Sequence, residues 1–291
     1  MRILLTGGSG FVGSRLATQA IAAGHQVLTF SRSQATLEEG VQHLRASISQ
    51  PPWREIERFR PDLLVHTAWE TTPGVYLDSP ENRQWLHWSQ VLIQGLVHRG
   101  THRFLTLGTC IECQMTGLPL GEDAPTDPKS TYARSKDELR QWLAETFSKE
   151  PERWTWVRLF YPYGPGEHPS RLCSSLINRL CRGESLELKT PHSVKDYIYV
   201  DDVVSALISI LQSNQSGIFH LGTGQGATVL ELAQKIGSLL GKSDLIRWSN
   251  PPAVDPFAHV VAKPTRLKSL GWFPQVRLDE GLGRLIQACT P

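Results

Sequence analysis

The chain has 291 residues, a length typical of about two domains, and its 40% hydrophobic and 20% charged residues argue against a disordered or fibrous protein. Thirty Lys and Arg residues against 28 Asp and Glu leave a formal charge of +2, which gives no sign of a nucleic-acid or membrane-surface partner. No apolar run is long enough for a membrane span or a signal peptide, so we expect a soluble, cytoplasmic protein.

Predicted strands and helices alternate through the first part of the chain. The strands are expected at residues 2–5, 26–30, 62–68, 103–107 and 154–160, with helices at 11–24, 81–99 and 132–147. The strands are continuous apolar runs, as burial on both faces of a parallel sheet requires. This pattern predicts an α/β fold of the Rossmann type, with a doubly wound parallel sheet.

The second part of the chain has a different pattern of predicted elements. Helices are expected at residues 172–183, 203–212, 229–240 and 278–288, and strands at 185–188, 196–200 and 217–221. We therefore expect a dinucleotide-binding Rossmann domain at residues 1–163, with 195–215 packing back on it. Residues 164–291 are expected to form a smaller α/β cap that binds the substrate.

A glycine loop follows the first predicted strand. The segment Thr6-Gly-Gly-Ser-Gly-Phe-Val-Gly13 fits G-x-G-x-x-G when read from Gly8 and G-x-x-G-x-x-G when read from Gly7. Such glycines allow a tight turn, close approach to a pyrophosphate and close packing of helix on strand, and the helix N-terminus presents N–H groups to the anion. The predicted site comprises Gly7, Gly10, Phe11, Val12 and Gly13.

The end of the second predicted strand bears on the choice of dinucleotide. NAD-binding domains usually place an acid there for the ribose 2′-hydroxyl, but this chain has Ser31-Arg32-Ser33. A guanidinium between two hydroxyls suits a 2′-phosphate. We therefore predict a preference for NADP(H), with NAD(H) as the alternative, and a solvated loop arginine as the simpler interpretation of Arg32.

Tyr132 and Lys136 lie four residues apart at the start of a predicted helix, and therefore on one face of it. An ammonium near a phenol favours the phenolate, and so lowers a pKa that is about 10 when unperturbed. Together with a nicotinamide, such a pair can move a proton at a carbonyl or carbinol oxygen while hydride moves at its carbon. The same spacing also occurs on helix surfaces without any function.

Further motifs extend the pattern over nearly the whole chain: Leu107-Gly-Thr109, Tyr163-Gly-Pro165, Lys195 to Asp202 and His220 to Gly224. With them the chain resembles the extended short-chain dehydrogenase/reductases, and within them the nucleotide-sugar epimerases, dehydratases and ketoreductases. The resemblance implies that Tyr132 is the catalytic acid/base, Lys136 its partner and ribose ligand, and Thr109 the donor to the reacting oxygen. It also implies that Thr67, Ala68 and Tyr161 border the cofactor.

Two departures from the family pattern narrow the reaction. Dehydratases in the resembled family carry Asp-Glu directly after the strand-end Thr, where this chain has Cys110-Ile111. Glu112 is displaced by one residue and is not expected to replace that acid, so a 4,6-dehydratase is disfavoured. The usual Asn before Tyr-Gly-Pro is also absent, because Tyr161-Pro-Tyr163 stands there.

The substrate residues are expected mainly in the second part. The resemblance places His168, Arg171 and Lys195 near a nucleotide diphosphate, and Trp69, at a strand end, either stacks on a sugar or base or caps the sheet edge. No metal site is expected. The Cys110-x-x-Cys113 pair lacks a second pair at zinc spacing, which leaves buried packing or a redox role open.

We therefore predict an NADP(H)-dependent oxidoreductase acting on a nucleotide-linked sugar, in first place a 4-ketoreductase. A 4-epimerase with retained NAD(P) and a non-catalytic dinucleotide-sensing protein are the alternatives. The resemblance also implies a homodimer through the helices at 81–99 and 132–147, which carry Trp85, Trp88 and Trp142.

Overall fold

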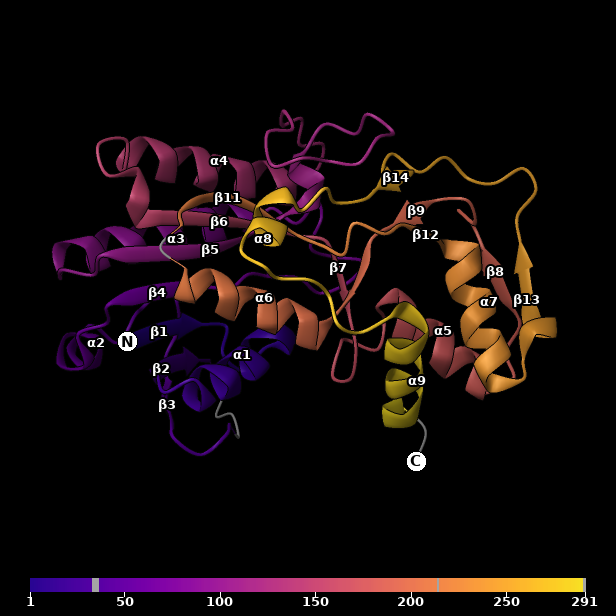
Figure 1. The fold of residues 1–291 in the computed structure, drawn as a ribbon, viewed down its shortest axis with the longest axis horizontal. Coiled ribbons are helices and arrows are strands. Elements are labelled where there is room, and N and C mark those ends of the chain that lie inside the picture. Colours follow the sequence, from indigo (N-terminus) through magenta and orange to yellow (C-terminus); the bar gives the residue numbers. More distant parts are fainter. Residues whose placement is uncertain (33–36, 214, 290–291) are drawn as a thin grey trace. The chain divides into compact units, whose positions relative to one another are not determined.

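The structure is a computed structural model that describes residues 1–32, 37–213 and 215–289. Seven strands form its main sheet in the order β11-β6-β5-β4-β1-β2-β3 (Figure 1). Their bounds are β1 (Arg2–Thr6), β2 (Gln26–Ser31), β3 (Val41–Arg45), β4 (Leu63–His66), β5 (Arg103–Thr109), β6 (Trp154–Leu159) and β11 (Gly217–Leu221). The five strands from β3 to β5 pair in parallel. This is the predicted Rossmann sheet.

The strand order reverses between β1 and β4. From β1 the chain runs outward to β2 and β3, and then returns past β1 to β4 and β5. In open α/β sheets, ligands bind outside the carboxyl ends of the strands at such a reversal. The glycine loop follows β1, and Thr67 and Ala68 follow β4, so both segments lie at this point of the sheet.

Helices flank the sheet, and most lie where the apolar spacing places them. They are α1 (Phe11–Ala22), α2 (Trp53–Phe59), α3 (Glu81–His98), α4 (Thr131–Thr146) and α6 (Val200–Gln212). Among the main sheet and the helices that flank it, two elements were not predicted. Strand β3 is only half-buried and carries Gln42 and His43 in its middle, and α2 has only seven residues, so neither shows a clear apolar period.

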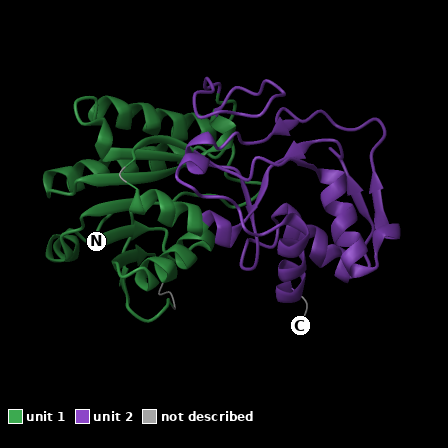
Figure 2. Cartoon of the chain, in the orientation of Figure 1, with its two compact units in different colours: residues 1–112, 128–158, 204–219 green, residues 113–127, 159–203, 220–291 purple. Residues whose placement is uncertain are grey.

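The chain divides into two compact units (Figure 2). The first contains residues 1–112, 128–158 and 204–219, and the second contains 113–127, 159–203 and 220–291. These units differ from the predicted boundaries in two ways. Residues 113–127 and 159–163 belong to the second unit, and the segment that returns to the first is 204–219 rather than 195–215.

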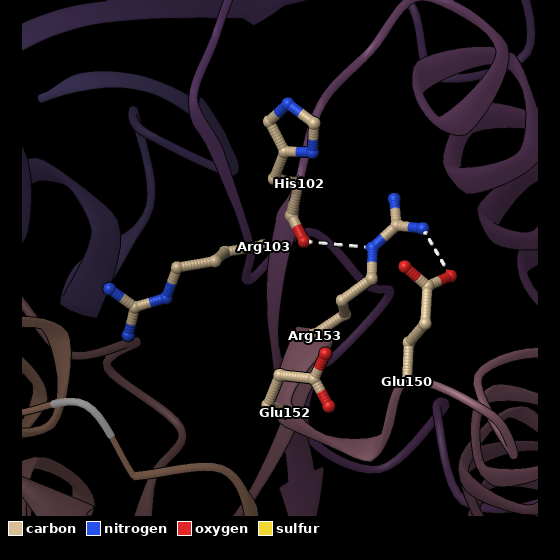
Figure 3. Close-up of a pocket in the computed structure, with 5 residues that line it drawn as sticks. All are labelled: His102, Arg103, Glu150, Glu152 and Arg153. Atoms are coloured by element: carbon tan, nitrogen blue, oxygen red, sulfur yellow. Dashed lines mark hydrogen bonds and ion pairs between the residues drawn. The ribbon is translucent and has the colours of Figure 1, made fainter.

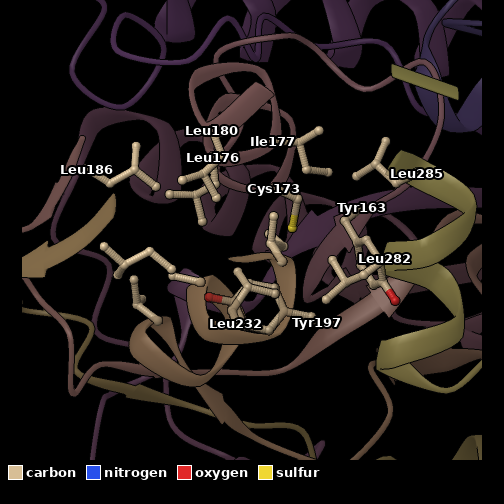
Figure 4. Close-up of a cluster of buried hydrophobic side chains, with 14 of the residues drawn as sticks. Tyr163, Cys173, Leu176, Ile177, Leu180, Leu186, Tyr197, Leu232, Leu282 and Leu285 are labelled. Carbon is tan, nitrogen blue, oxygen red and sulfur yellow. The ribbon is translucent and has the colours of Figure 1, made fainter. Parts of the chain in front are cut away.

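The second unit has its own apolar core. Its helices are α5 (Leu172–Cys181), α7 (Val229–Leu240), α8 (Thr265–Ser269) and α9 (Leu278–Cys289), and its short strands are β7 (Tyr161–Tyr163), β8 (Leu186–Leu188), β9 (Val194–Lys195), β10 (Tyr197–Tyr199), β12 (Ala227–Thr228), β13 (Ile246–Trp248) and β14 (His259–Val260). Side chains from α5, α7 and α9 meet in this core, among them Ile177, Leu232 and Leu282 (Figure 4). Helix α7 begins with a capping box between Thr228 and Glu231, which fixes its first turn.

Within the described residues, no helix combines the length and the apolar composition needed to cross a membrane. The same part of the chain contains no group of His, Cys, Asp and Glu side chains placed to hold a metal ion. Cys110 and Cys113 are buried thiols in the segment that follows β5.

Candidate functional site

The glycine loop leaves no room for side chains. Gly7 has φ +74°, and a Cβ there would lie 2.5 Å from Thr67 Oγ1. A Cβ on Gly13 would lie 2.1 Å from the Gly7 carbonyl oxygen, and one on Gly10 would lie 3.2 Å from the same atom. The loop therefore needs glycine both for its turn and for the close packing of α1 on it.

Helix α1 ends this loop with an open N-terminus. Its N-cap is Gly10, which has no side chain to accept from the first turn, and the first N–H groups of a helix lack intrahelical partners. Phe11, Val12 and Gly13 form that first turn. The cradle of small residues and the uncapped amides of the first turn fit the pyrophosphate of a dinucleotide, since backbone donors and the helix dipole both favour an anion.

The ends of β1 and β4 are tied together by a buried hydrogen-bond chain. Ser89 Oγ donates to the Trp85 carbonyl at 2.7 Å, so it accepts from His66 Nε2, 2.9 Å away. His66 Nδ1 then accepts from Thr6 Oγ1 at 2.7 Å. Burial, together with repulsion from Lys136, lowers the pKa of His66 to about 3, which keeps the ring neutral as this chain requires.

Thr67 and Ala68 complete this edge. Thr67 Oγ1 donates to the Thr6 carbonyl at 2.7 Å, and the Ala68 amide lies 3.4 Å from Thr6 Oγ1. The structure thus places both residues directly beside Gly7, where the resemblance implied a cofactor border.

Two of the predicted 2′-phosphate residues, Ser31 and Arg32, lie at the end of β2. Ser31 Oγ lies 2.8 Å from His43 Nε2, and Arg32 is exposed. Arg32 is close enough to Glu70 to contribute to the lowered pKa of that carboxyl, whose largest cause is the hydrogen bond from the Thr72 side chain. Ser33 lies outside the described residues.

Tyr132 and Lys136 come together in the first turns of α4. Ser130 caps the helix by accepting from the Ala133 amide at 3.1 Å, and the Tyr132 amide donates to the Leu77 carbonyl at 2.8 Å. The Lys136 Nζ lies 6.0 Å from the centre of the Tyr132 ring and donates to the Leu107 carbonyl at 2.8 Å. Burial lowers the pKa of Lys136 to about 7, and attraction to Glu112 opposes that shift.

Thr109 ends β5, two residues beyond Leu107, and a buried carboxylate fixes the turn behind it. Glu112 is completely buried, and its carboxylate accepts from the Thr109 amide at 2.7 Å. It also accepts from Trp156 Nε1 at 3.0 Å and from Arg158 Nε at 3.1 Å. Burial raises the pKa of Glu112, whereas the Arg158 charge opposes this rise. The four residues that make these contacts are all buried.

Trp69 stands just beyond β4 and is 9% exposed. Its ring centre lies 3.9 Å from Lys136 Nζ, and its Nε1 donates to Asn82 Oδ1 at 2.8 Å. The rings of Trp85 and Tyr132 pack against it at 6.2 and 6.3 Å. The structure therefore brings Trp69 to the Tyr132 and Lys136 pair, while stacking on a substrate stays a prediction.

The remaining predicted residues belong to the second unit. His168 is exposed, and Arg171 is the N-cap residue of α5. Lys195 is buried, pairs with Asp255 at 2.8 Å and donates to the Phe257 carbonyl, so its charge is already balanced inside this unit. Tyr161 begins β7, and its amide donates to the Asp196 carbonyl at 3.1 Å.

Two surface cavities of the first unit lie away from these residues. One is lined by His102, Arg103, Glu150, Glu152 and Arg153, and in it Arg153 donates to the His102 carbonyl and pairs with Glu150 (Figure 3). The other contains Arg2 and Asp62, which pair with one another. Both cavities border the amino ends of strands, so they lie at the sheet edge opposite Thr109.

Sequence reasoning missed the roles of Glu112, Arg158 and His66. A signal was present, because Arg158 interrupts the apolar run Trp154-Thr-Trp-Val-Arg-Leu159 of a strand expected to be buried. A buried guanidinium needs a counter-charge, and the nearest unassigned acid after a neighbouring strand was Glu112.

Comparisons with known proteins agree with this architecture. UDP-glucuronic acid decarboxylase 1 from Danio rerio is 28% identical over 308 residues, which cover 98% of this chain and 72% of that protein. The structure of UDP-glucose 4-epimerase from Thermotoga maritima, solved with UDP-glucose, is 26% identical with a TM-score of 0.87 and covers 99% of this chain and 98% of that one. The UDP-glucose 4-epimerase from Thermus thermophilus, solved with NAD, has the same identity and TM-score and covers 99% of both chains.

The family assignment rests on a broader comparison. The model of the NAD dependent epimerase/dehydratase family matches residues 3–222, which include the glycine loop, Thr109, Tyr132 and Lys136. The predicted resemblance is thereby confirmed at the level of the family. Because this match spans well over half of the 291 residues, the chain belongs to the NAD dependent epimerase/dehydratase family.

Proposed function

We propose that the protein is an NAD(P)-dependent oxidoreductase acting on a nucleotide-linked sugar, and in first place a 4-ketoreductase. The observation that carries this proposal is the buried ammonium of Lys136 beside Tyr132, in the same compact unit as the glycine cradle. Thr109 is the last residue of β5, the strand whose Leu107 carbonyl accepts from Lys136. The three predicted catalytic residues therefore lie on two neighbouring elements, β5 and α4.

In the proposed reaction, Tyr132 donates its phenolic proton to a sugar carbonyl oxygen, and Thr109 Oγ donates a hydrogen bond that stabilises the negative charge developing on that oxygen. Lys136 holds a positive charge next to the phenolate that remains. A nicotinamide dinucleotide held by the glycine loop would supply the hydride to the carbonyl carbon. The reverse direction uses Tyr132 as the base.

The position of Glu112 favours carbonyl chemistry over elimination. A 4,6-dehydratase of the resembled kind needs an acid and a base directly after the strand-end Thr, and here Cys110 and Ile111 stand there. Glu112 accepts three hydrogen bonds behind that turn and is ion-paired with Arg158. A carboxylate held in this way is not available as the acid or base of an elimination. This supports a reaction that uses only Thr109, Tyr132 and Lys136.

We propose NADP(H) as the preferred dinucleotide, with NAD(H) as the alternative. The exposed Arg32 at the end of β2 supports a 2′-phosphate contact. The Thermus thermophilus relative solved with NAD supports the alternative, as does the acid Glu70 near Arg32.

A second candidate is a sugar-nucleotide 4-epimerase, which returns the hydride to the opposite face of the sugar and normally keeps its cofactor. It is favoured by the two solved 4-epimerases, each 26% identical over almost the whole chain. A dinucleotide sensor without turnover is the third candidate. The complete set of Thr109, Tyr132 and Lys136 argues against it, because a sensor does not need all three.

Within this proposal the glycine loop of the first unit binds the dinucleotide, and residues of the second unit bind the diphosphate of the nucleotide sugar. Arg171 is the first choice among the predicted diphosphate ligands, because it is the N-cap residue of α5, whereas Lys195 is already paired with Asp255. We also propose a homodimer through α3 and α4, which pack on one another, and light scattering in solution tests it.

The purified protein, assayed with a panel of UDP-, dTDP-, CDP- and GDP-sugars and their 4-keto derivatives, tests the function. Stoichiometric loss of added NADPH with a 4-keto sugar supports the reductase, and sugar interconversion without net cofactor turnover supports the epimerase. UDP-glucuronic acid belongs in the panel, with CO₂ release as the readout, because decarboxylases are among the relatives. For both the reductase and the epimerase, Tyr132→Phe is expected to abolish whichever reaction the panel reveals while it retains dinucleotide binding. Unchanged turnover in this variant would refute the mechanism.

A further inference from the structure

The ammonium of Lys136 is held in an environment that disfavours its charge. The side chain is 2% exposed, and one of its three N–H groups donates to the Leu107 carbonyl at 2.8 Å. Over the described ranges, Lys136 makes no ion pair, because the nearby carboxylate of Glu112 is held by Arg158. Some other group must therefore offset part of the cost of burying this charge.

The face of Trp69 is the closest such group. Lys136 Nζ lies 3.9 Å from the centre of the Trp69 ring, compared with 6.0 Å for the Tyr132 ring. The negative face of an indole attracts a cation more strongly than that of a phenol, and the attraction grows when water is excluded. Trp69 is 9% exposed, so the contact between ammonium and indole is largely shielded from solvent.

A hydrogen bond and a stacked ring fix the orientation of the Trp69 indole. Its Nε1 donates to Asn82 Oδ1 at 2.8 Å, and the Asn82 amide donates to the carbonyls of Tyr76 at 2.6 Å and Ser79 at 2.9 Å. Trp85 stacks against the same ring. These contacts hold the ring in one orientation, with its face toward the Lys136 ammonium.

We propose that Trp69 is a positioning residue, whose indole face holds the Lys136 ammonium against Tyr132 and keeps it charged for the proton transfer assigned to Tyr132. This inference rests on the proposed function for the role of Tyr132. The other charged or titratable groups that face Lys136 are Glu112 from the turn after β5, which is paired with Arg158, and His66 from β4, which is held neutral. Tyr132 faces it from the same helix.

Titration of Tyr132 by tyrosinate absorbance tests this role without any substrate. Each variant is measured alone and in a Tyr132→Phe background, and the difference isolates the Tyr132 phenol. Removing the π-face with Trp69→Leu makes the ammonium less favourable and withdraws positive charge from the phenolate. The Tyr132 midpoint is therefore expected to rise by at least about one pH unit, and Trp69→Phe, which keeps a weaker face, is expected to give a smaller rise.

Trp88→Leu is the matched control, because Trp88 belongs to the same aromatic cluster through Trp85, whereas the rings over which the Lys136 ammonium lies are those of Trp69 and Tyr132. It is expected to leave the midpoint unchanged. A Trp69→Leu midpoint equal to that of Trp88→Leu, or shifted downward, would overturn the proposal. If Trp69→Leu does not fold, the comparison of Trp69→Phe with the parent chain decides by the same criterion.

The turnover experiment separates this inference from the proposed function. If no sugar nucleotide reacts but the Tyr132 midpoint follows the order of the Trp69 variants, the positioning role stands and the function is wrong. If a substrate is found, the pH profile of kcat is expected to shift in the same direction as the titration, and a profile that stays fixed while the protein remains folded would count against the role of Trp69.

Discussion

Neutralising Glu112 is expected to destabilise the first unit strongly. In Glu112→Gln the guanidinium of Arg158, which is 1% exposed, loses its counter-charge. The N–H₂ group of the new glutamine side chain also replaces an oxygen that accepted hydrogen bonds, so it faces donors instead of acceptors. Two unit charges 3.1 Å apart attract by about 5 kcal/mol at an effective dielectric constant of about 20. Desolvation offsets part of this attraction, but breaking such a pair leaves a buried charge, so the expected loss is about 3–5 kcal/mol of unfolding free energy.

Urea unfolding of a double-mutant cycle measures this loss. The cycle comprises Glu112→Gln, Arg158→Met and the double variant, which removes the stranded charge and is expected to be more stable than Glu112→Gln by at least about 1 kcal/mol. Glu150→Gln breaks a solvent-accessible Arg–Glu pair and is the control, with an expected effect within about 1 kcal/mol. The reasoning is refuted if Glu112→Gln costs no more than this control, or if the effects of the two single changes simply add.

Three further predictions concern the cofactor edge of the sheet. Gly13→Ala places a Cβ against the Gly7 carbonyl and is expected to weaken dinucleotide binding at least about tenfold by fluorescence titration, whereas Gly283→Ala, where a Cβ meets nothing within 4 Å, leaves binding unchanged. Arg32→Ala is expected to weaken NADPH at least about tenfold and NADH little; equal losses for both would contradict the 2′-phosphate contact. His66 has a folded-state pKa of about 3, below its unfolded value, so the unfolded chain binds the extra proton and stability falls as pH drops from about 6.5 toward 3. His66→Gln is expected to flatten that part of the stability curve by up to about 1.4 kcal/mol per pH unit, and an identical slope in the variant would argue against a buried neutral ring.

The sequence predicted the parts of the site that depend on local rules. Gly7, Gly10 and Gly13 were recognisable because a tight turn before a helix restricts residue type, and Tyr132 with Lys136 because a spacing of four places two side chains on one helix face. The long apolar runs likewise gave the strands of the Rossmann sheet, since burial on both faces leaves few polar positions.

The rest depends on which distant segments meet, and periodicity does not report this. Glu112 and Arg158 are 46 residues apart and Trp69 and Lys136 are 67 apart, so no local pattern links the members of either pair. Strand β3 and helix α2 escaped prediction because one is half-exposed and the other very short. The unit boundaries differ for a similar reason, because residues 113–127 carry no periodic signal that assigns them to either unit.

The two units are interleaved along the chain, which passes from one to the other after residues 112, 127, 158, 203 and 219. During synthesis from the amino end, a nascent chain that has reached residue 158 still lacks the last part of the first unit, which includes the start of β11, the strand that borders β6. The first unit therefore cannot be completed on the ribosome until about three quarters of the polypeptide has been made. Neither unit corresponds to one continuous gene fragment, so expressing either alone would require joining separated coding segments.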